Sequence, residues 1–144
     1  MPYTYEYSRP AVTVDIIVLR NAMTQVLLIK RLLPPFENQW ALPGGFVEME
    51  ETLEKAAERE LEEETGITGI SLSQFHAFSD PDRDPRHRTI SVVFWGEAGQ
   101  DKYLTKAGSD AKEAKWFEIN NLPSLAFDHD KILRKAVTEL INRM

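Results

Sequence analysis

The chain has 144 residues, of which 42 % are hydrophobic and 28 % charged, with a net charge of −6 and no cysteine. The length suits one domain over residues 1–144, and the lack of cysteine excludes disulfides, a thiolate nucleophile and thiolate metal sites. The acidic balance without a Lys/Arg cluster argues against nucleic acid as a partner, and no apolar run approaches the ~20 residues of a membrane-spanning helix.

The first half of the chain predicts a β-hairpin, a loop and one helix. The β-branched stretch AVTVDIIVLR at 11–20 predicts a strand, and QVLLIKR at 25–31 predicts its hairpin partner. Pro34-Pro35 predicts a loop over 32–38. Thr52 is a candidate N-cap and Gly66 a candidate C-terminal residue for a helix between them.

The second half predicts three strands and a closing helix. The strands are expected at 72–78, 89–95 and 114–119, and the first two are separated by the Pro-rich, charged loop DPDRDPRH. Asp128 can cap a closing helix with helically spaced apolar residues. These elements predict an α/β fold with a sheet covered on both faces, although they do not define the topology.

The predicted central helix and the loop before it carry the acidity of the chain. Residues 48–64 contain nine Glu against Lys55 and Arg59, a balance of −7, so the rest of the chain is close to neutral. Like charges at helical spacing repel one another. The acidity therefore indicates one site and not a generally acidic surface.

Three of these carboxylates overlap the apolar stripe of the helix. At about 100° per residue, Glu60, Glu63 and Glu64 share an arc of roughly 100° that overlaps the buried side. Unpaired charge is costly there, and Arg59 alone cannot balance three carboxylates. Hard oxygen ligands without Cys or paired His favour Mg²⁺ or Mn²⁺ over zinc, and such cations commonly bind substrate phosphates.

The same segment resembles a known family motif. Gly45, Glu51 and the run RELEEETGI at 59–67 match the Nudix box, GX5EX7REUXEEXGU, at every fixed position. The chain is therefore identified as similar to the Nudix hydrolases over its whole length. This resemblance implies an α/β/α sandwich with a mixed sheet between helices, and hydrolysis of the pyrophosphate bond of a nucleoside diphosphate linked to a moiety X.

The resemblance also implies roles for individual residues of the box. Arg59 would orient the glutamates, and Glu51 would brace the preceding loop against the helix. Glu63 is the favoured general base, with Glu113 as a candidate from outside the box. The metal ligands would be the carbonyl of Gly44 and the side chains of Glu60, Glu63 and Glu64.

Downstream segments resemble ADP-ribose pyrophosphatases. Pro81 lies fifteen residues after Gly66, within FSDPDRDPRHRTISVVF, and LAFDHDKIL at 125–133 resembles the last helix of the same group. The resemblance implies ADP-ribose as substrate, with AMP and ribose 5-phosphate as products. The candidate substrate-binding residues are Arg31, Phe36, Trp40, Pro81, Arg83, Arg86 and His129.

Each of these candidates also has a purely structural interpretation. Arg83 and Arg86 could form ion pairs with Asp82 and Asp84, and the aromatic residues could belong to the core. The alternative functions are hydrolysis of an oxidised nucleotide or nucleotide sugar, and a non-catalytic ADP-ribose-sensing domain of a regulator of NAD metabolism.

The resemblance and the N-terminus suggest a location and an assembly. Residues 1–10, MPYTYEYSRP, lack a basic segment followed by an apolar core, so no secretory signal is predicted and a cytoplasmic location is expected. Related pyrophosphatases are often homodimers that exchange N-terminal strands. The segment YTYEY is a candidate for such an exchange.

Overall fold

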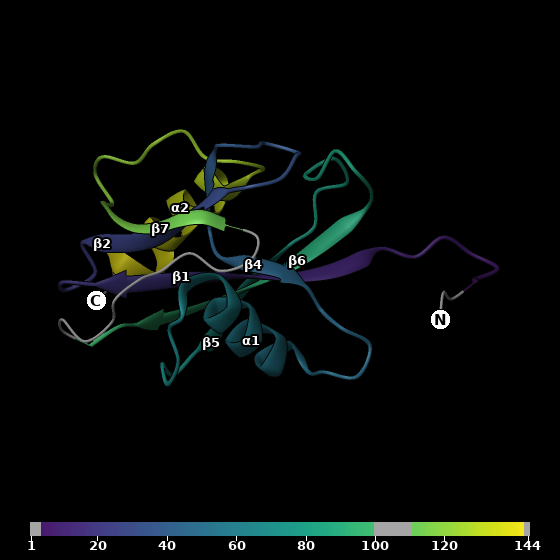
Figure 1. The fold of residues 1–144 in the computed structure, drawn as a ribbon, viewed down its shortest axis with the longest axis horizontal. Helices are drawn as coiled ribbons and strands as arrows, with labels where there is room; N and C mark the ends of the chain where they lie inside the picture. The colour runs from purple at the N-terminus through teal and green to yellow at the C-terminus, as the bar shows by residue number, and fades with distance from the viewer. Residues whose placement is uncertain (1–3, 100–110, 143–144) are drawn as a thin grey trace.

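The computed structural model describes residues 4–99 and 111–142, and a mixed sheet lies at its centre (Figure 1). Within these residues the sheet has seven strands. The strands are β1 (Ala11–Arg20), β2 (Gln25–Arg31), β3 (Trp40–Ala41), β4 (Gly44–Phe46), β5 (Ser73–Phe78), β6 (Thr89–Glu97) and β7 (Ala111–Glu118). The helical elements are α1 (Leu53–Thr65), α2 (His129–Ala136) and a π-helical turn, η1 (Val137–Ile141).

The sheet is organised around β1, which has a parallel neighbour on one edge and two antiparallel neighbours on the other. The strand order is β3-β2-β1-β6-β5, with β4 paired to β1 and β7 paired to β2. The antiparallel edge of β1 is shared: Leu19 and Arg20 pair with β2, whereas Thr13–Asp15 pair with β4. The hairpin partners β1 and β2 therefore separate toward the start of β1.

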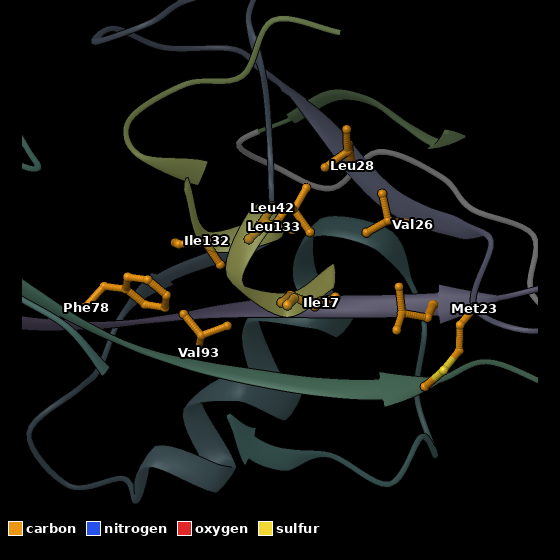
Figure 2. Packing of buried hydrophobic residues seen from close by; sticks show 11 residues of the cluster. Ile17, Met23, Val26, Leu28, Leu42, Phe78, Val93, Ile132 and Leu133 are labelled. Atoms are coloured by element: carbon orange, nitrogen blue, oxygen red, sulfur yellow. The ribbon is translucent and has the colours of Figure 1, made fainter. Parts of the chain in front are cut away.

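The two helices cover opposite faces of the sheet. Alternate residues of a strand point to opposite faces, so the apolar run of β1 supplies two cores. On one face Val14, Ile16 and Val18 form a cluster with Ala56, Ala57 and Leu61 of α1. On the other, Ile17 and Leu19 form a cluster with Ile132, Leu133 and Ala136 of α2, part of which Figure 2 shows. The predicted α/β/α sandwich is confirmed.

The predicted strand positions agree closely with the structure, with differences at the ends. β1 and β2 have the predicted bounds, and β5 begins one residue later than expected. β6 continues to Glu97, and β7 spans Ala111–Glu118 where 114–119 was expected. The closing helix leaves α-helical geometry after Ala136 and ends in η1.

The sequence prediction missed β3 and β4. Each has only two or three residues, and two of the three in β4 are glycines, which have low strand propensity. β4 forms because its backbone pairs with β1, with Asp15 opposite Gly44 and Val14 opposite Gly45. This pairing depends on tertiary structure. No helix in residues 4–99 and 111–142 combines the length and apolar character needed to cross a bilayer.

Truncation of a core residue should test the contact between α2 and the sheet. Ile132 is fully buried in the cluster of Figure 2. Ile132→Ala should lower the free energy of unfolding by about 2–5 kcal/mol, because it removes buried methylene groups and leaves a cavity. Chemical denaturation measures the change. Met49→Ala, at a position that is 70 % exposed, is the control and should have little effect.

Candidate active site

The acidic helix α1 begins and ends at the predicted residues. The Thr52 hydroxyl accepts a hydrogen bond of 3.1 Å from the backbone N–H of Lys55. At the other end Gly66 has a left-handed φ of 78°, and its N–H donates to the carbonyl of Glu62. These two caps define the register that places one face of the glutamate run against the sheet.

Two of the three predicted ligand glutamates are buried, and the third is not. Glu60 and Glu64 are 9 % and 6 % exposed, in agreement with their expected position beside the apolar stripe. The side chain of Glu63 is 50 % exposed, so it lies at the outer edge of the arc and not within the buried face. A helical wheel alone does not show how far the sheet extends over a helix.

The Arg59 guanidinium connects the helix to the preceding loop and to β4. It donates to both carboxylate oxygens of Glu51, at 3.0 and 2.6 Å, and to the carbonyl of Phe46 at 3.0 Å. Its Nη1 also donates to Glu60 at 3.1 Å and to Glu63 at 3.2 Å. These contacts join the loop, the helix and β4 through one guanidinium, and the orienting role of Arg59 and the bracing role of Glu51 stay predictions.

The paired charges of Glu51 and Arg59 stabilise each other. The hydrogen bonds from Arg59, together with one from the backbone N–H of Glu48, lower the pKa of Glu51 from 4.5 to about 2. The hydrogen bond to Glu51 raises the pKa of Arg59 further above its ordinary value. Both groups are therefore charged at neutral pH.

The two glycines of β4 allow the buried carboxylates to contact the backbone. The N–H of Gly44 donates to Glu64 Oε1 at 2.7 Å. A Cβ atom at Gly45 would lie 2.2 Å from Glu60 Oε2, which is closer than any real contact. Glycine at this position therefore makes room for the Glu60 carboxylate.

The residue types at this cluster fit a hard divalent cation, although the side chains do not form a complete site. Carboxylate and carbonyl oxygens are the ligands that Mg²⁺ and Mn²⁺ prefer. Among residues 4–99 and 111–142, however, no three Asp, Glu or His side chains converge well enough to hold a metal ion. As they lie, Glu60 and Glu63 share Arg59, whereas Glu64 binds Gly44.

A cavity of about 210 Å³ adjoins this cluster, where β1 and β2 separate. Its lining comes from β1 to β4, the loop at 32–38, α1, the loop at 79–88, β6 and the segment that begins α2. Six of the predicted site residues line it, namely Arg31, Gly44, Glu64, Arg83, Arg86 and His129. The other predicted residues, Phe36, Trp40, Glu51, Arg59, Glu60, Glu63 and Pro81, lie outside its lining.

The three predicted arginines differ in their hydrogen-bond partners. Arg83 is buried, and its guanidinium donates to both carboxylate oxygens of Asp128, at 3.0 and 2.7 Å. The expected ion pair of Arg83 with Asp82 or Asp84 is therefore wrong. Arg86 does pair with Asp84, at 3.1 and 2.8 Å. Arg83 thus ties the 79–88 loop to α2.

The guanidinium groups of Arg31 and Arg86 both lie close to the ring of Phe127, a residue that was not predicted for the site. The guanidinium of Arg31 donates to the carbonyl of Pro35 at 2.7 Å and lies 4.9 Å from the ring centroid of Phe127. The guanidinium of Arg86 lies 5.7 Å from the same centroid. Phe127 lines the cavity, and its φ of 52° is unusual for a residue other than glycine.

The predicted aromatic residues pack against other rings. Phe36 contacts Phe127 with ring centroids 4.8 Å apart, behind the cavity lining. Trp40 packs edge-on against Phe117 at 4.7 Å, in agreement with its structural interpretation. Pro81 is exposed in the loop. The alternative base Glu113 faces Lys30 at 3.9 Å on the β2–β7 pair, outside the cavity lining.

Sequence reasoning missed Asp15, which lies on the cavity floor. It is 7 % exposed in the middle of the apolar strand β1, and its Oδ2 accepts a hydrogen bond from Ser91 at 2.5 Å. The only indication in the sequence is one carboxylate within AVTVDIIVLR. A charged residue in a strand that is buried on both faces requires a partner or a function.

Comparisons with known proteins agree with this architecture. The NUDIX domain family model matches residues 9–139, so the chain belongs to the NUDIX domain family. An ADP-ribose pyrophosphatase of Methanocaldococcus jannaschii is 50 % identical over 128 residues, which cover 89 % of this chain and 73 % of that protein. The predicted similarity to Nudix hydrolases, and among them to ADP-ribose pyrophosphatases, is confirmed.

A transcriptional repressor and a solved NUDIX domain are also similar to this chain. The ADPR responsive transcriptional repressor NtrR of Acinetobacter baylyi is 32 % identical over 144 residues, covering 96 % of this chain but 57 % of the repressor. The NUDIX domain of Shewanella oneidensis NrtR, in a cocrystal structure with ADP ribose, superposes with a TM-score of 0.83 at 26 % identity, covering 93 % of this chain and 90 % of that one.

The Glu51–Arg59 pair predicts a dependence of stability on acid. Because the folded pKa of Glu51 is about 2 and its ordinary value is 4.5, the pair stabilises fully above about pH 4.5, and this contribution is lost as pH falls toward 2. Glu51→Gln should therefore be less stable than the wild type at pH 7, and the difference should shrink below pH 4.5.

Urea denaturation at pH 7, 4 and 3 measures that difference. Glu50→Gln, at an exposed neighbouring position, is the matched control and should track the wild type. A stability difference for Glu51→Gln that stays constant from pH 7 to pH 3 would contradict the ion-pair explanation.

Proposed function

We propose that this protein hydrolyses ADP-ribose to AMP and ribose 5-phosphate with the help of Mg²⁺ or Mn²⁺. The observation that carries the proposal is one cavity with a buried carboxylate, Glu64, at one end and two guanidinium groups, Arg31 and Arg86, along its walls. A pyrophosphate needs both, because its negative charge must be bound while a cation is held beside it. The relative at 50 % identity supports ADP-ribose as the substrate.

In the proposed reaction, water attacks one phosphorus atom of the pyrophosphate and the bridging P–O bond breaks. Arg31 and Arg86 bind the phosphate oxygens and hold the substrate along the cavity. Glu63 is the proposed general base, because its exposed carboxylate is accessible to water and Arg59 Nη1 orients it at 3.2 Å. Glu60, Glu63, Glu64 and the carbonyl of Gly44 would hold the metal ion. A metal ion held there would supply positive charge to the phosphate oxygens as negative charge develops on them.

The proposal includes a homodimer, a small-molecule nucleotide substrate and a cytoplasmic location. Residues 4–10 extend away from the body of the molecule (Figure 1), and Tyr7 in this arm is 72 % exposed. Such an arm can contact a second subunit without rearrangement of the sheet. Sedimentation equilibrium of the full chain, with and without residues 1–10, tests this assembly.

A second candidate function is ADP-ribose sensing without hydrolysis. It is favoured by the similarity to the NrtR NUDIX domain, whose structure contains ADP ribose. The intact glutamate cluster favours hydrolysis instead. The two functions differ in one measurement, since a sensor binds ADP-ribose without releasing AMP. A panel of substrates that also contains oxidised nucleotides and nucleotide sugars, ranked by kcat/KM, tests which moiety is linked to the nucleoside diphosphate in the preferred substrate.

Loss of one buried carboxylate should remove most of the activity. Glu64→Gln should lower kcat for ADP-ribose by about 100-fold or more, the scale of one major electrostatic group in an active site. Glu62→Gln is the matched control, because Glu62 is exposed on the same helix and occupies a variable position of the box. Wild-type kcat in Glu64→Gln, measured by AMP release, would contradict the assignment.

Metal binding should also appear without any substrate. Millimolar Mg²⁺ should raise the Tm of the wild type, because a cation that binds only the folded cluster stabilises it. Differential scanning calorimetry measures the shift. The shift should be smaller in Glu60→Gln, which loses a proposed ligand, and unchanged in Glu62→Gln. An equal shift in all three proteins would indicate nonspecific screening of charge.

A further inference from the structure

The floor of the cavity holds two buried polar side chains that the proposed hydrolysis does not use in a defined way. Asp15 of β1 and His129 of α2 are 7 % and 3 % exposed, and both line the cavity. They come from opposite ends of the chain. Buried polar groups usually have complete hydrogen bonding, so each needs an account of its partners.

The backbone determines which nitrogen of His129 carries the proton. The N–H of Leu42 donates to His129 Nδ1 at 3.0 Å, so the lone pair of this nitrogen is used. Burial lowers the pKa of His129, which favours the neutral ring. A neutral ring that accepts at Nδ1 carries its proton on Nε2. The side of the ring that faces Asp15 is therefore a hydrogen-bond donor.

Asp15 presents an acceptor beside this donor. Its Oδ2 accepts from Ser91 at 2.5 Å, and Arg83 Nη2 lies 4.0 Å from the same oxygen. Its Oδ1 lies 3.6 Å from His129 Nε2, which exceeds an ordinary hydrogen bond. Within the described part of the chain, the hydrogen bonds of these two side chains use Asp15 Oδ2 and His129 Nδ1, and Oδ1 and Nε2 have only each other as a potential hydrogen-bond partner, at 3.6 Å. A donor and an acceptor thus lie side by side, and both are incomplete.

A hydroxyl group is the ligand that completes both atoms. It can donate to the carboxylate oxygen and accept from the imidazole N–H at the same time. A metal ion does not fit, because Nε2 carries a proton and has no lone pair to offer. A phosphate oxygen does not fit, because it would meet the negative charge of Asp15.

The location of Asp15 and His129 indicates which hydroxyl group of the substrate they contact. A Cβ atom at Gly44 would lie 2.5 Å from Asp15 Oδ1, so the carboxylate touches the glycine whose N–H binds Glu64. The pair is therefore next to the glutamate cluster. In a dinucleotide-like substrate, the groups adjacent to the pyrophosphate are riboses, each joined through its 5′ carbon.

We propose that Asp15 and His129 bind a ribose hydroxyl of the substrate and make the enzyme selective for a ribose, over a deoxyribose, beside the pyrophosphate. This inference rests on the proposed function for its substrate class. The pair are specificity-determining residues and take no part in bond breaking. Arg83, held by Asp128, places a positive charge near the buried carboxylate that does the binding.

Substrate analogues test the proposal with the wild-type protein. ADP-ribose is compared with two analogues, one that lacks the 2′-hydroxyl of the adenosine ribose and one that lacks the 2′-hydroxyl of the terminal ribose. One analogue should lose at least 10-fold in kcat/KM, because the two buried polar atoms are then left unpaired. The analogue with the lower kcat/KM identifies which ribose contacts Asp15 and His129. Equal kcat/KM for all three compounds would overturn the inference.

The same comparison separates this inference from the proposed function. If ADP-ribose is not hydrolysed, the proposed function fails, and the Kd values of the three compounds from calorimetry still test hydroxyl recognition. If ADP-ribose is hydrolysed but the analogues bind and react equally well, only the inference fails.

A variant assigns the selectivity to Asp15. Asp15→Asn keeps the shape of the side chain and removes the charged acceptor. KM for ADP-ribose should rise about 10-fold or more, with a smaller change in kcat. The penalty, meaning the loss of kcat/KM on removal of the 2′-hydroxyl, should fall to about 2-fold. Asp130→Asn makes the same change at an exposed position of α2 and should keep the wild-type penalty. An undiminished penalty in folded Asp15→Asn would overturn the assignment.

Discussion

The contact between the acidic face of α1 and the glycines of β4 positions the rest of the site. A helix with this many glutamates is tolerated against a sheet only because the strand opposite has no side chains there. Glu60 occupies the space beside Gly45, and Glu64 binds the N–H of Gly44. Arg59 then joins the helix, the loop and the strand through one guanidinium. The helix caps and the pairing of β4 with β1 keep these groups in register.

The cavity next to that contact is lined by both carboxylate and guanidinium groups. Glu64 of α1 contributes a carboxylate to the lining, β2 contributes the guanidinium of Arg31, and the 79–88 loop contributes those of Arg83 and Arg86 together with the carboxylate of Asp84. The guanidinium groups are themselves held, Arg31 by backbone carbonyls and Arg86 by Asp84. Held side chains lose little further entropy when a ligand binds. Asp15 and His129 also line the cavity. Asp15 offers a hydrogen-bond acceptor and neutral His129 a hydrogen-bond donor, and an uncharged polar group can use both.

Much of this arrangement could be predicted from the sequence where the determinants are local. The helix α1, its two caps and the burial of Glu60 follow from residue spacing within one segment, and the hairpin β1–β2 follows from two apolar runs. The functional assignment rested on the spacing of the box, which is also local. Six of the predicted residues line one cavity.

The features that sequence reasoning missed depend on contacts between distant segments. Arg83 looked like a surface residue because Asp82 and Asp84 flank it, yet its partner is Asp128, 45 residues away. Asp15 is a single carboxylate within an apolar strand and was not predicted for the site. Its meaning depends on Ser91 and His129, which reach it only in the folded sheet. β4 formed against the propensity of its glycines for the same reason.

The long sequence separation between His129 and its partners has a consequence for the order in which the cavity forms. The hydrogen bond from Leu42 to His129 spans 87 residues, and Asp128 beside His129 holds Arg83. During synthesis the strands and the acidic helix leave the ribosome before α2, so the ligand cavity is completed only after α2 has emerged. A nascent chain that has not yet released α2 thus contains the whole glutamate cluster and lacks one wall of the cavity.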